Sequence, residues 1–457
     1  MKSVCLRLWW TLSWCLVWVV VAVATPANAT GVDWKQALGE RMQQGSEVAL
    51  FGISGSNTLG ARLAPALVQA FFTAEGLQDV RIAVPRENEQ RIEAVWMGGE
   101  RPIRVVVAVK AHGTRTGFEA LQRGEADLAA ASRPLTETEA LGMADLGNLR
   151  SPGQEHVVAI DGLAIIVHPD NPLRQLDIAQ ITALFAGSVN NWRALGGPDR
   201  QVRIYARDDK SGTYDTFERL VLRGASLDKR ALRFESNALL AQSVMADPGG
   251  IGFVPLANVA QAHALAVADS QVAALPPTVL TVASEDYLLS RRLYLYSLPE
   301  QQRSAAVSAF LDFARSDAGQ HIVEDSGFVA QALHPVSVTP SDARLLGWQR
   351  LNLNLRFADG ASDLDTKALV DVERLAAYIG RQGADAGQLT LVGFSKPLSG
   401  TGQSALSRLR AQNVRWALRQ QGVRSPIETL AGDAVLVADP RSPQADRNRR
   451  VEVWIRQ

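Results

Sequence analysis

The sequence predicts an α/β fold: a domain of two lobes, followed by a small α+β domain of order β-α-β-α-β. Three observations support this prediction. Apolar runs of strand length alternate with helical periodicity from about residue 47 to residue 335, which is typical of α/β architecture. That stretch is long for a single sheet, so two lobes are expected. The alternation breaks at two prolines and then resumes in a shorter form up to residue 457.

Residues 1–29 predict a signal peptide. Lys2 and Arg7 give a positive start, and an apolar run extends from Leu8 to Ala24. Ala27-Asn28-Ala29 then supplies the small-x-small pattern that signal peptidase recognises, so cleavage is expected after Ala29. The alternative is a single membrane anchor, for which the apolar run is slightly short. We therefore expect an exported, periplasmic protein.

The composition excludes several classes of protein. The chain has 47 Lys and Arg residues against 47 Asp and Glu residues, so it lacks the basic excess expected of a nucleic-acid-binding protein. With 47% hydrophobic and 21% charged residues, the chain is globular rather than disordered. Both cysteines, Cys5 and Cys15, lie in the signal peptide. The mature protein is therefore expected to contain neither a disulfide nor a reactive thiolate.

The first domain is expected over residues 47–335. It begins with a strand from Val48 to Ile53, and further strands are clearest at Ile103 to Val109 and Leu163 to Val167. Helical segments are expected to contain Phe118 to Leu121, Ile178 to Leu184 and Phe217 to Leu222. Because strands joined through helices usually pair in parallel, largely parallel sheets are expected.

A linker is expected at residues 336–346, where prolines and small polar residues interrupt the pattern. The second domain is expected at residues 347–457. Its predicted elements are a strand at Leu351 to Leu355, a helix at Leu364 to Ile379, a strand at Leu389 to Val392, a helix at Leu406 to Leu418 and a strand at Val451 to Ile455. This order makes a compact, self-sufficient unit.

Three short segments gather Ser, Thr and Gly at the start of a predicted helix. A helix N-terminus has unpaired N–H groups and a partial positive charge, so it attracts anions, and small residues let an oxyanion approach the backbone. Any one such segment could be an ordinary helix cap, but three in one chain favour anion binding. The segments are Ser54-Gly55-Ser56-Asn57-Thr58, Gly113-Thr114-Arg115-Thr116-Gly117 and Lys210-Ser211-Gly212-Thr213.

The third segment is the most specific because Arg207 and Asp209 precede its hydroxyl groups. An arginine can grip a tetrahedral oxyanion with two hydrogen bonds. A carboxylate beside an anion is favourable only if the ligand carries a proton, as phosphate does at neutral pH and sulfate does not. Asp209 is therefore a candidate for selecting phosphate. The alternative is a surface turn that contains an Arg–Asp pair.

Residues from about 47 to 330 resemble the phosphate-binding proteins of phosphate ABC transporters, which are type 2 periplasmic binding proteins. The resemblance implies two α/β lobes that close on a buried phosphate or related oxyanion, with an ABC transporter permease as partner. It rests on Gly55 to Leu59, Gly124 to Leu128, Ala131 to Leu135, Arg207 to Thr213, Ser236-Asn237 and Pro248 to Phe253.

The same resemblance implies the phosphate ligands, to which we add Arg115 as a basic neighbour of the second segment. Some family members have an acidic residue where Arg133 stands. Arg133 would instead add positive charge, which leaves selectivity for phosphate over sulfate open. The expected phosphate-binding residues are Thr58, Leu59 through its backbone, Thr114, Arg115, Arg133, Arg207, Asp209, Ser211, Gly212 and Thr213.

The second domain resembles the OmpA C-terminal-like peptidoglycan-binding domains, through Leu391 to Phe394, Leu406 to Val414 and Asn448 to Val453. Such domains hold diaminopimelate with an aspartate and an arginine. The resemblance places the arginine at Arg410, but Ser395 and Lys396 stand where the aspartate is expected. Association with the cell wall or outer membrane is therefore implied with half of the ligand clamp missing.

Enzymatic activity is not expected. The six histidines are scattered without the spacing of a metal site, and no nucleophile elbow, Walker loop or dinucleotide fingerprint occurs. We expect no cofactor and no metal. A phosphate receptor is favoured over two alternatives: an envelope-organising structural protein with a vestigial or sensory anion site, and a hydrolase of phosphate esters.

Overall fold

The computed structural model describes most of the chain after the expected signal peptide, which itself lies outside the described residues. The described residues are 34–35, 38, 47–98, 101–209, 211–358, 363–382, 387–395, 402–432 and 436–456. Within these ranges, no helix is both long enough and apolar enough to cross a membrane.

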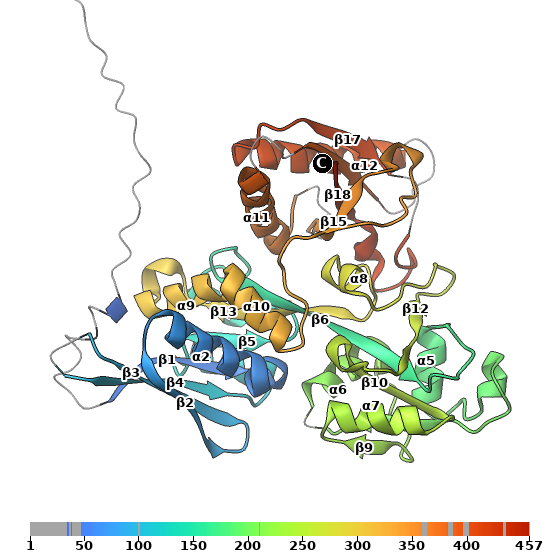
Figure 1. The fold of residues 1–457 in the computed structure, drawn as a ribbon, viewed down its shortest axis with the longest axis horizontal. Helices are drawn as coiled ribbons and strands as arrows, with labels where there is room; N and C mark the ends of the chain where they lie inside the picture. Colours follow the sequence, from blue (N-terminus) through green and yellow to red (C-terminus); the bar gives the residue numbers. More distant parts are fainter. Residues whose placement is uncertain are drawn as a thin grey trace, which may run out of the picture.

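The N-terminal domain, which extends from β1 to α10, is built around one mixed sheet (Figure 1). The strand order is β2 (Gln78–Arg86), β3 (Glu89–Trp96), β4 (Ile103–Lys110), β1 (Glu47–Gly55), β5 (Leu128–Ala131), β13 (Ser290–Ser297), β6 (Glu155–Val167), β10 (Gly250–Pro255), β8 (Arg203–Arg207) and β9 (Leu232–Phe234), with β11 (His263–Ala264) also paired to β6. A separate pair joins β7 (Gln175–Asp177) to β12 (Ala266–Ala268).

The long, fully buried strand β6 connects the two lobes. Its first part, from Glu155 to Gly162, pairs with β13 in the first lobe, and its last part, from Leu163 to Val167, pairs with β10 in the second. The sheet thus passes from one lobe into the other along a single strand. The expected strands at residues 48–53, 103–109 and 163–167 are confirmed as parts of β1, β4 and β6.

The expectation of largely parallel sheets is wrong, because the sheet is mixed. β1 is parallel to β4 and β5, whereas β6 is antiparallel to β13 and β10, and β3 is antiparallel to both neighbours. The physical reason is connection length. Only Glu87 and Asn88 separate β2 from β3, and a connection this short permits only antiparallel pairing. Asn88 adopts a left-handed backbone, φ 61°, which asparagine tolerates better than most residues.

Helices cover the sheet of each lobe. The three predicted helical segments are confirmed within α3, α5, and α6 with its continuation at Glu218–Leu222. The helices are α2 (Ala64–Ala74), α3 (Thr114–Gln122), α4 (Glu137–Gly142), α5 (Ile178–Phe185), α6 (Gly212–Phe217), α7 (Asn237–Ala246), α8 (Val279–Ala283), α9 (Ala305–Arg315) and α10 (Asp317–Asp325).

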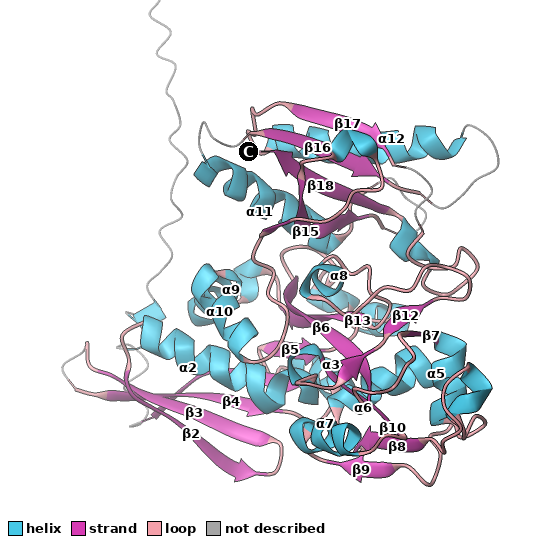
Figure 2. Ribbon diagram, turned by 45° about the vertical axis from the view of Figure 1, so that its right-hand side comes forward, coloured by secondary structure: helices cyan, strands magenta, loops and turns pink. Residues whose placement is uncertain are grey.

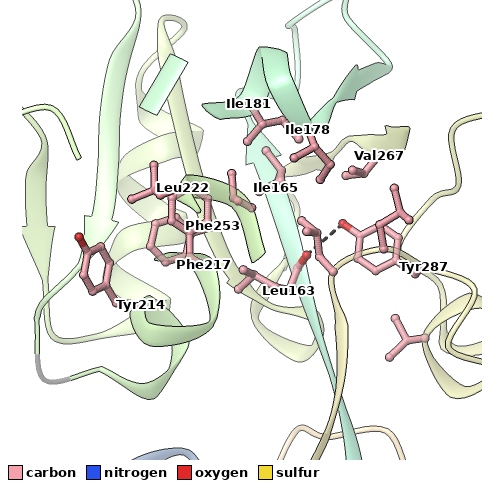
Figure 3. Packing of buried hydrophobic residues seen from close by; sticks show 14 of the residues in the cluster. Leu163, Ile165, Ile178, Ile181, Tyr214, Phe217, Leu222, Phe253, Val267 and Tyr287 are labelled. Atoms are coloured by element: carbon pink, nitrogen blue, oxygen red, sulfur yellow. Dashed lines mark hydrogen bonds between the residues drawn. The ribbon is translucent and has the colours of Figure 1, made fainter. Parts of the chain in front are cut away.

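Aromatic packing anchors α6 in the second lobe (Figure 3). Phe217 on α6 stacks on Phe253 of β10, with ring centroids 4.0 Å apart and planes 2° from parallel. Nearby, the Tyr287 hydroxyl donates a 3.0 Å hydrogen bond to the Leu163 carbonyl oxygen of β6. Because both phenylalanines are fully buried, their stacking anchors the C-terminal end of α6 to β10.

Residues 335–456, which comprise the C-terminal domain and the connection before it, contain a five-stranded sheet with two helices packed against it. Its strands are ordered β14 (Pro335–Val336), β15 (Gln349–Arg356), β18 (Arg450–Arg456), β16 (Gln388–Gly393) and β17 (Ile427–Ala431), and its helices are α11 (Thr366–Gln382) and α12 (Gly402–Gln420). The predicted β-α-β-α-β elements are confirmed, although α11 begins two residues later than expected, at Thr366. β17 is an additional edge strand, in which the adjacent polar residues Glu428 and Thr429 weaken the sequence signal.

The segment 336–346, expected to be a linker, is packed rather than extended away. Val336 in β14 pairs with Arg350 in β15, and Leu345 is 3% exposed beside Trp348. The C-terminal domain also packs against the N-terminal domain, where β15 contacts α8. Figure 2 shows β15 above α8.

Candidate anion-binding site

A cavity of about 340 Å³ lies between the two lobes, and five of the expected phosphate-binding residues line it. Thr58 reaches it from the first lobe, and the other four come from the second. The second-lobe members are Arg207, Ser211, Gly212 and Thr213. Thr58 and Arg207, about 150 positions apart in the sequence, thus lie at one cavity because the two lobes pack against each other.

The second-lobe wall combines the end of β8 with the start of α6. Ser211 caps α6 by accepting a 3.2 Å hydrogen bond from the Thr213 backbone N–H. Ser211 and Thr213 are each 7% exposed. A helix N-terminus with two hydroxyl groups offers hydrogen-bond donors and a favourable dipole to an oxyanion. Lys210 lies outside the described residues.

Arg207 is held by neutral oxygen atoms on two sides and by one carboxylate. Its Nε donates to the Phe234 carbonyl oxygen at 3.0 Å, its Nη1 donates to Asn237 Oδ1, and its Nη2 lies 3.4 Å from Asp208 Oδ2. Burial lowers the pKa of Arg207, and Asp208 only partly offsets this effect. The guanidinium is therefore oriented at the cavity wall while its charge is incompletely neutralised.

The two lobes touch where Thr58 meets Gly212. A Cβ atom added to Gly212 would lie 2.1 Å from Thr58 Oγ1 and 2.9 Å from the Thr58 backbone nitrogen, so only glycine fits between the lobes in this closed arrangement. Leu59, the neighbour expected to contribute its backbone, has a side chain that is 1% exposed in the first-lobe core.

Arg291 on β13 joins the two walls, and the sequence analysis did not identify it. Its Nη2 donates to Thr58 Oγ1 at 2.9 Å, to the Gly212 carbonyl oxygen at 3.0 Å and to Asp161 Oδ2 at 2.9 Å. Arg291 is 6% exposed. Two adjacent arginines, Arg291 and Arg292, in an otherwise apolar strand were the available signal, because a buried charge is rare without a specific role.

Thr114 and Arg133 lie apart from this cavity. Thr114, at the start of α3, accepts a 3.1 Å hydrogen bond from the Ser132 backbone N–H. Arg133 forms two hydrogen bonds with Glu139, at 2.7 and 2.8 Å, and these bonds lower the pKa of Glu139 to about 2. The charge of Arg133 is therefore partly compensated by Glu139. Arg133 and Ser132 line a different, larger cavity.

The structure does not bring Arg115 and Asp209 to the cavity. The Arg115 side chain is 83% exposed and pairs with Glu119 at 2.8 Å, one turn along α3. The Asp209 side chain is 85% exposed and pairs with Arg233. Asp208, one residue earlier, is the member of this loop whose side chain lines the cavity.

Arg410 is buried in the C-terminal domain, 4% exposed. Its Nη1 donates to the Phe394 carbonyl oxygen at 3.1 Å, and its guanidinium lies 5.2 Å from the centre of the Phe357 ring. Burial and the nearby charge of Arg449 lower its pKa to about 10. Lys396 lies outside the described residues.

In the described part of the chain, no three His, Cys, Asp or Glu side chains are grouped as a metal site requires. The inter-lobe cavity instead presents hydroxyl groups, a helix N-terminus and a guanidinium. Such donors bind a small oxyanion.

Comparison with known proteins agrees with this architecture. A family model described as a PBP superfamily domain matches residues 97–318. Protein SphX of Synechococcus elongatus is 31% identical over 278 residues, covering 57% of this chain and 77% of SphX. The phosphate-binding protein PstS of Staphylococcus epidermidis is 30% identical over 229 residues, covering 48% of this chain and 68% of PstS. An ABC-type phosphate transport receptor from Vibrio cholerae superposes with a TM-score of 0.47 and 24% identity, covering 61% of this chain and 99% of the receptor.

The two-lobed mixed α/β fold with an inter-lobe site defines a periplasmic-binding-protein-like domain of the PBP superfamily. Within that class, the chain belongs to the family of SphX and the PstS phosphate-binding proteins. Members of this family are binding proteins rather than enzymes, in agreement with the expectation of a non-enzymatic protein.

Proposed function

We propose that this protein is a phosphate receptor whose two lobes close on one phosphate. The observation that carries the proposal is the meeting of Thr58 with the Arg207–Thr213 segment at one inter-lobe cavity. Its relatives include proteins named for phosphate binding. The hydrolase alternative receives no support, because no activated nucleophile or metal cluster accompanies these donors in the described residues.

Each wall of the cavity has a distinct role in this proposal. Ser211, Gly212 and Thr213 present the N-terminus of α6 to the anion, and Arg207 supplies the positive charge. Thr58 contributes a hydroxyl group from the first lobe. Binding of the anion by both lobes therefore accompanies closure of the lobes. Arg291 contacts both lobes and acts as a positioning residue.

Calorimetric titration of the mature protein with phosphate, arsenate and sulfate tests the proposal. Arg207→Ala should weaken phosphate binding at least about tenfold, because a charge-assisted hydrogen bond at a desolvated site contributes about 1.5–3 kcal/mol. Arg193→Ala is the matched control, since Arg193 is a second-lobe arginine that is 76% exposed. Absence of phosphate binding in the wild type would overturn the proposal.

We further propose that the protein is exported to the periplasm and delivers phosphate to an ABC transporter permease. The signal-peptide pattern in residues 1–29 supports export. Detection of the mature chain in a periplasmic extract, with an N-terminus at Thr30, is the direct check.

The C-terminal domain is proposed to be an OmpA-like module that associates with the cell wall or outer membrane, with peptidoglycan as its ligand. Support comes from the order of its elements after β14 and from Arg410 in the Leu406–Val414 motif. We propose domain boundaries at 47–335 and 347–457, with 336–346 as a packed connection. If the wild type sediments with peptidoglycan but binds no phosphate, an envelope-organising protein with a vestigial or sensory anion site becomes the better description.

A further inference from the structure

A second cavity, of about 780 Å³, lies where both lobes and the C-terminal domain meet. The first lobe contributes Ser132 and Arg133, the second lobe contributes Arg219, and the C-terminal domain contributes Arg356 and Arg447. A cavity of this size is typical of a site for a small organic or polyatomic ligand. It exists only because the C-terminal domain is docked, so it is a property of the fused chain.

Arg219 stands out in this cavity because it has no hydrogen-bond or ion-pair partner among the described residues. It lies in the continuation of α6 at Glu218–Leu222 and lines the cavity as a residue that is also exposed to solvent. Burial and the positive charges of Arg291 and Arg133 lower the pKa of Arg219 to about 10. An arginine without a carboxylate partner, close to two further arginines, is a favourable position for an anion.

Four of the five carboxylates that line the cavity already have partners within the protein. Glu137 pairs with Arg150 at 2.7 Å, Asp365 pairs with Arg292 at 2.8 Å, and Glu155 accepts a 2.9 Å hydrogen bond from the Tyr296 hydroxyl. Glu285 is likewise paired with Arg292, whereas Asp446 is exposed at the rim. The other two members of the Arg219 group have carboxylate partners behind them: Glu139 for Arg133 and Asp161 for Arg291.

Arg447 adds a second cation without a carboxylate partner. It donates to the Tyr287 carbonyl oxygen at 3.0 Å, to Ser290 Oγ at 2.9 Å and to the Ser290 carbonyl oxygen at 3.0 Å. These acceptors are neutral, and the nearby carboxylates of Glu285, Asp446 and Asp286 compensate its charge only in part.

We propose that this second cavity binds an anion with at least two linked phosphate groups, at a site distinct from that for orthophosphate. Arginine forks match phosphate oxygen atoms, and Ser132 adds a hydroxyl group. A cavity of about 780 Å³ has room for an anion larger than a single orthophosphate. Thr58, Gly212 and Arg291 meet between the two cavities, so one ligand does not span them.

Titration of the full mature chain with pyrophosphate, in the presence of saturating orthophosphate, tests this inference. We expect pyrophosphate to bind under these conditions and to bind Arg207→Ala as well as it binds the wild type. Arg219→Ala should weaken pyrophosphate binding at least about tenfold, while Arg219→Lys should retain part of the affinity. Arg193→Ala serves as the control for removal of a second-lobe arginine.

Tripolyphosphate and ADP identify the source of the linked phosphates, because only ADP carries an organic group. Tighter binding of ADP would assign the site to phosphate esters, and tighter binding of tripolyphosphate would assign it to condensed inorganic phosphate. The inference is overturned if saturating orthophosphate abolishes pyrophosphate binding, or if Arg219→Ala binds pyrophosphate like the wild type. Orthophosphate binding by Arg219→Ala reports separately on the proposed receptor function and should stay unchanged.

Discussion

Asp286 of the N-terminal domain accepts a 2.8 Å hydrogen bond from Arg350 of the C-terminal domain, and both side chains are nearly sealed from solvent, 5% and 12% exposed. Asn354 donates to the other carboxylate oxygen at 2.7 Å. Arg356 lies 3.3 Å from the same oxygen. One acidic residue between α8 and β13 is thus held by three residues of β15, which docks the two domains rigidly.

This docking depends on polar groups that have lost their contact with water. Removing charges from water is costly, and only close pairing and hydrogen bonding offset the cost. Removal of one partner therefore lowers the free energy of unfolding by more than the intact pair contributes to it. Removal of the Asp286 carboxylate leaves the buried guanidinium groups of Arg350 and Arg356 without their nearest carboxylate.

Asp286→Ala is predicted to lower the free energy of unfolding by about 3–5 kcal/mol, the range found when one partner of a buried ion pair is removed. Denaturant unfolding at neutral pH measures this change. Asp199→Ala is the matched control, because Asp199 pairs with Arg193 at the surface and is 66% exposed; its effect should stay within about 1 kcal/mol. Equal effects of the two substitutions would contradict the importance of the buried network.

Glu285 gives the docking network a pH dependence. Burial alone would raise the pKa of Glu285, but Arg292, Lys367 and Arg356 outweigh this effect and lower it to about 2. In the unfolded chain its pKa returns to about 4.5. The unfolded state therefore takes up the proton first as the pH falls, so the stabilisation is complete above pH ~4.5 and is lost towards pH ~2.

Glu285→Gln should consequently remove part of the acid destabilisation. The difference in unfolding free energy between the wild type and Glu285→Gln is expected to shrink as the pH is lowered from 6 to 3, values chosen to bracket this window. Glu300→Gln changes an exposed glutamate outside the network and should keep the wild-type pH profile. A difference that stays constant with pH would refute the prediction.

Gly212→Ala is predicted to weaken phosphate binding at least about tenfold while leaving the protein folded. The added methyl group would meet Thr58 Oγ1 at 2.1 Å and the Thr58 backbone nitrogen at 2.9 Å, so the lobes would have to stay further apart. Titration gives the affinity, and thermal melting reports on folding. Gly142→Ala is the control, because nothing lies within 4 Å of a Cβ atom at that position. Wild-type affinity in Gly212→Ala would show that the ligand-bound state does not need this contact.

The sequence predicted the local elements well because they depend on short-range patterns, whereas one of the three predicted anion-binding segments, Gly113 to Gly117, lies apart from the inter-lobe cavity. Helix caps, apolar periodicity and clustered hydroxyl groups led to β1, α3 and α6, and the meeting of Thr58 with the Arg207–Thr213 segment follows from the two-lobed fold.

Contacts between segments that are far apart in the chain could not be predicted from such local patterns. Nothing local in the sequence indicates that Arg291 reaches Thr58 and Gly212, or that β15 receives Asp286. The direction of side chains in a loop was also hidden. Asp208 and Asp209 are adjacent, yet only Asp208 lines the cavity, because successive side chains of the loop point to different sides.

The two aspartates can be separated by their effect on selectivity. If a cavity carboxylate accepts the ligand proton, Asp208→Asn should let sulfate compete better with phosphate, since the amide can also donate a hydrogen bond. Asp209→Asn should discriminate like the wild type, because Asp209 is 85% exposed and pairs with Arg233. Competition titrations with sulfate measure both. A loss of selectivity confined to Asp209→Asn would support the role that the sequence motif suggests for Asp209.

The proposed wall contact of the C-terminal domain is predicted to be weak. Arg410 is 4% exposed and already donates to the Phe394 carbonyl oxygen, while Ser395 accepts a 2.9 Å hydrogen bond from the Ser407 hydroxyl. A ligand carboxylate would have to enter this buried site, and Ser395 offers no negative charge to a ligand ammonium. Lys396 would repel that ammonium, so a charge-assisted contact is missing.

Sedimentation of the full mature chain with purified peptidoglycan sacculi measures this binding. The wild type should sediment weakly, and Lys396→Asp should sediment more strongly because it restores an anion for the ammonium group. Arg410→Ala should abolish the gain when combined with Lys396→Asp, whereas Arg408→Ala, an exposed arginine on the same helix, should leave it intact. Strong sedimentation of the wild type that depends on Arg410 but not on Arg408 would show that the buried arginine is sufficient without the aspartate.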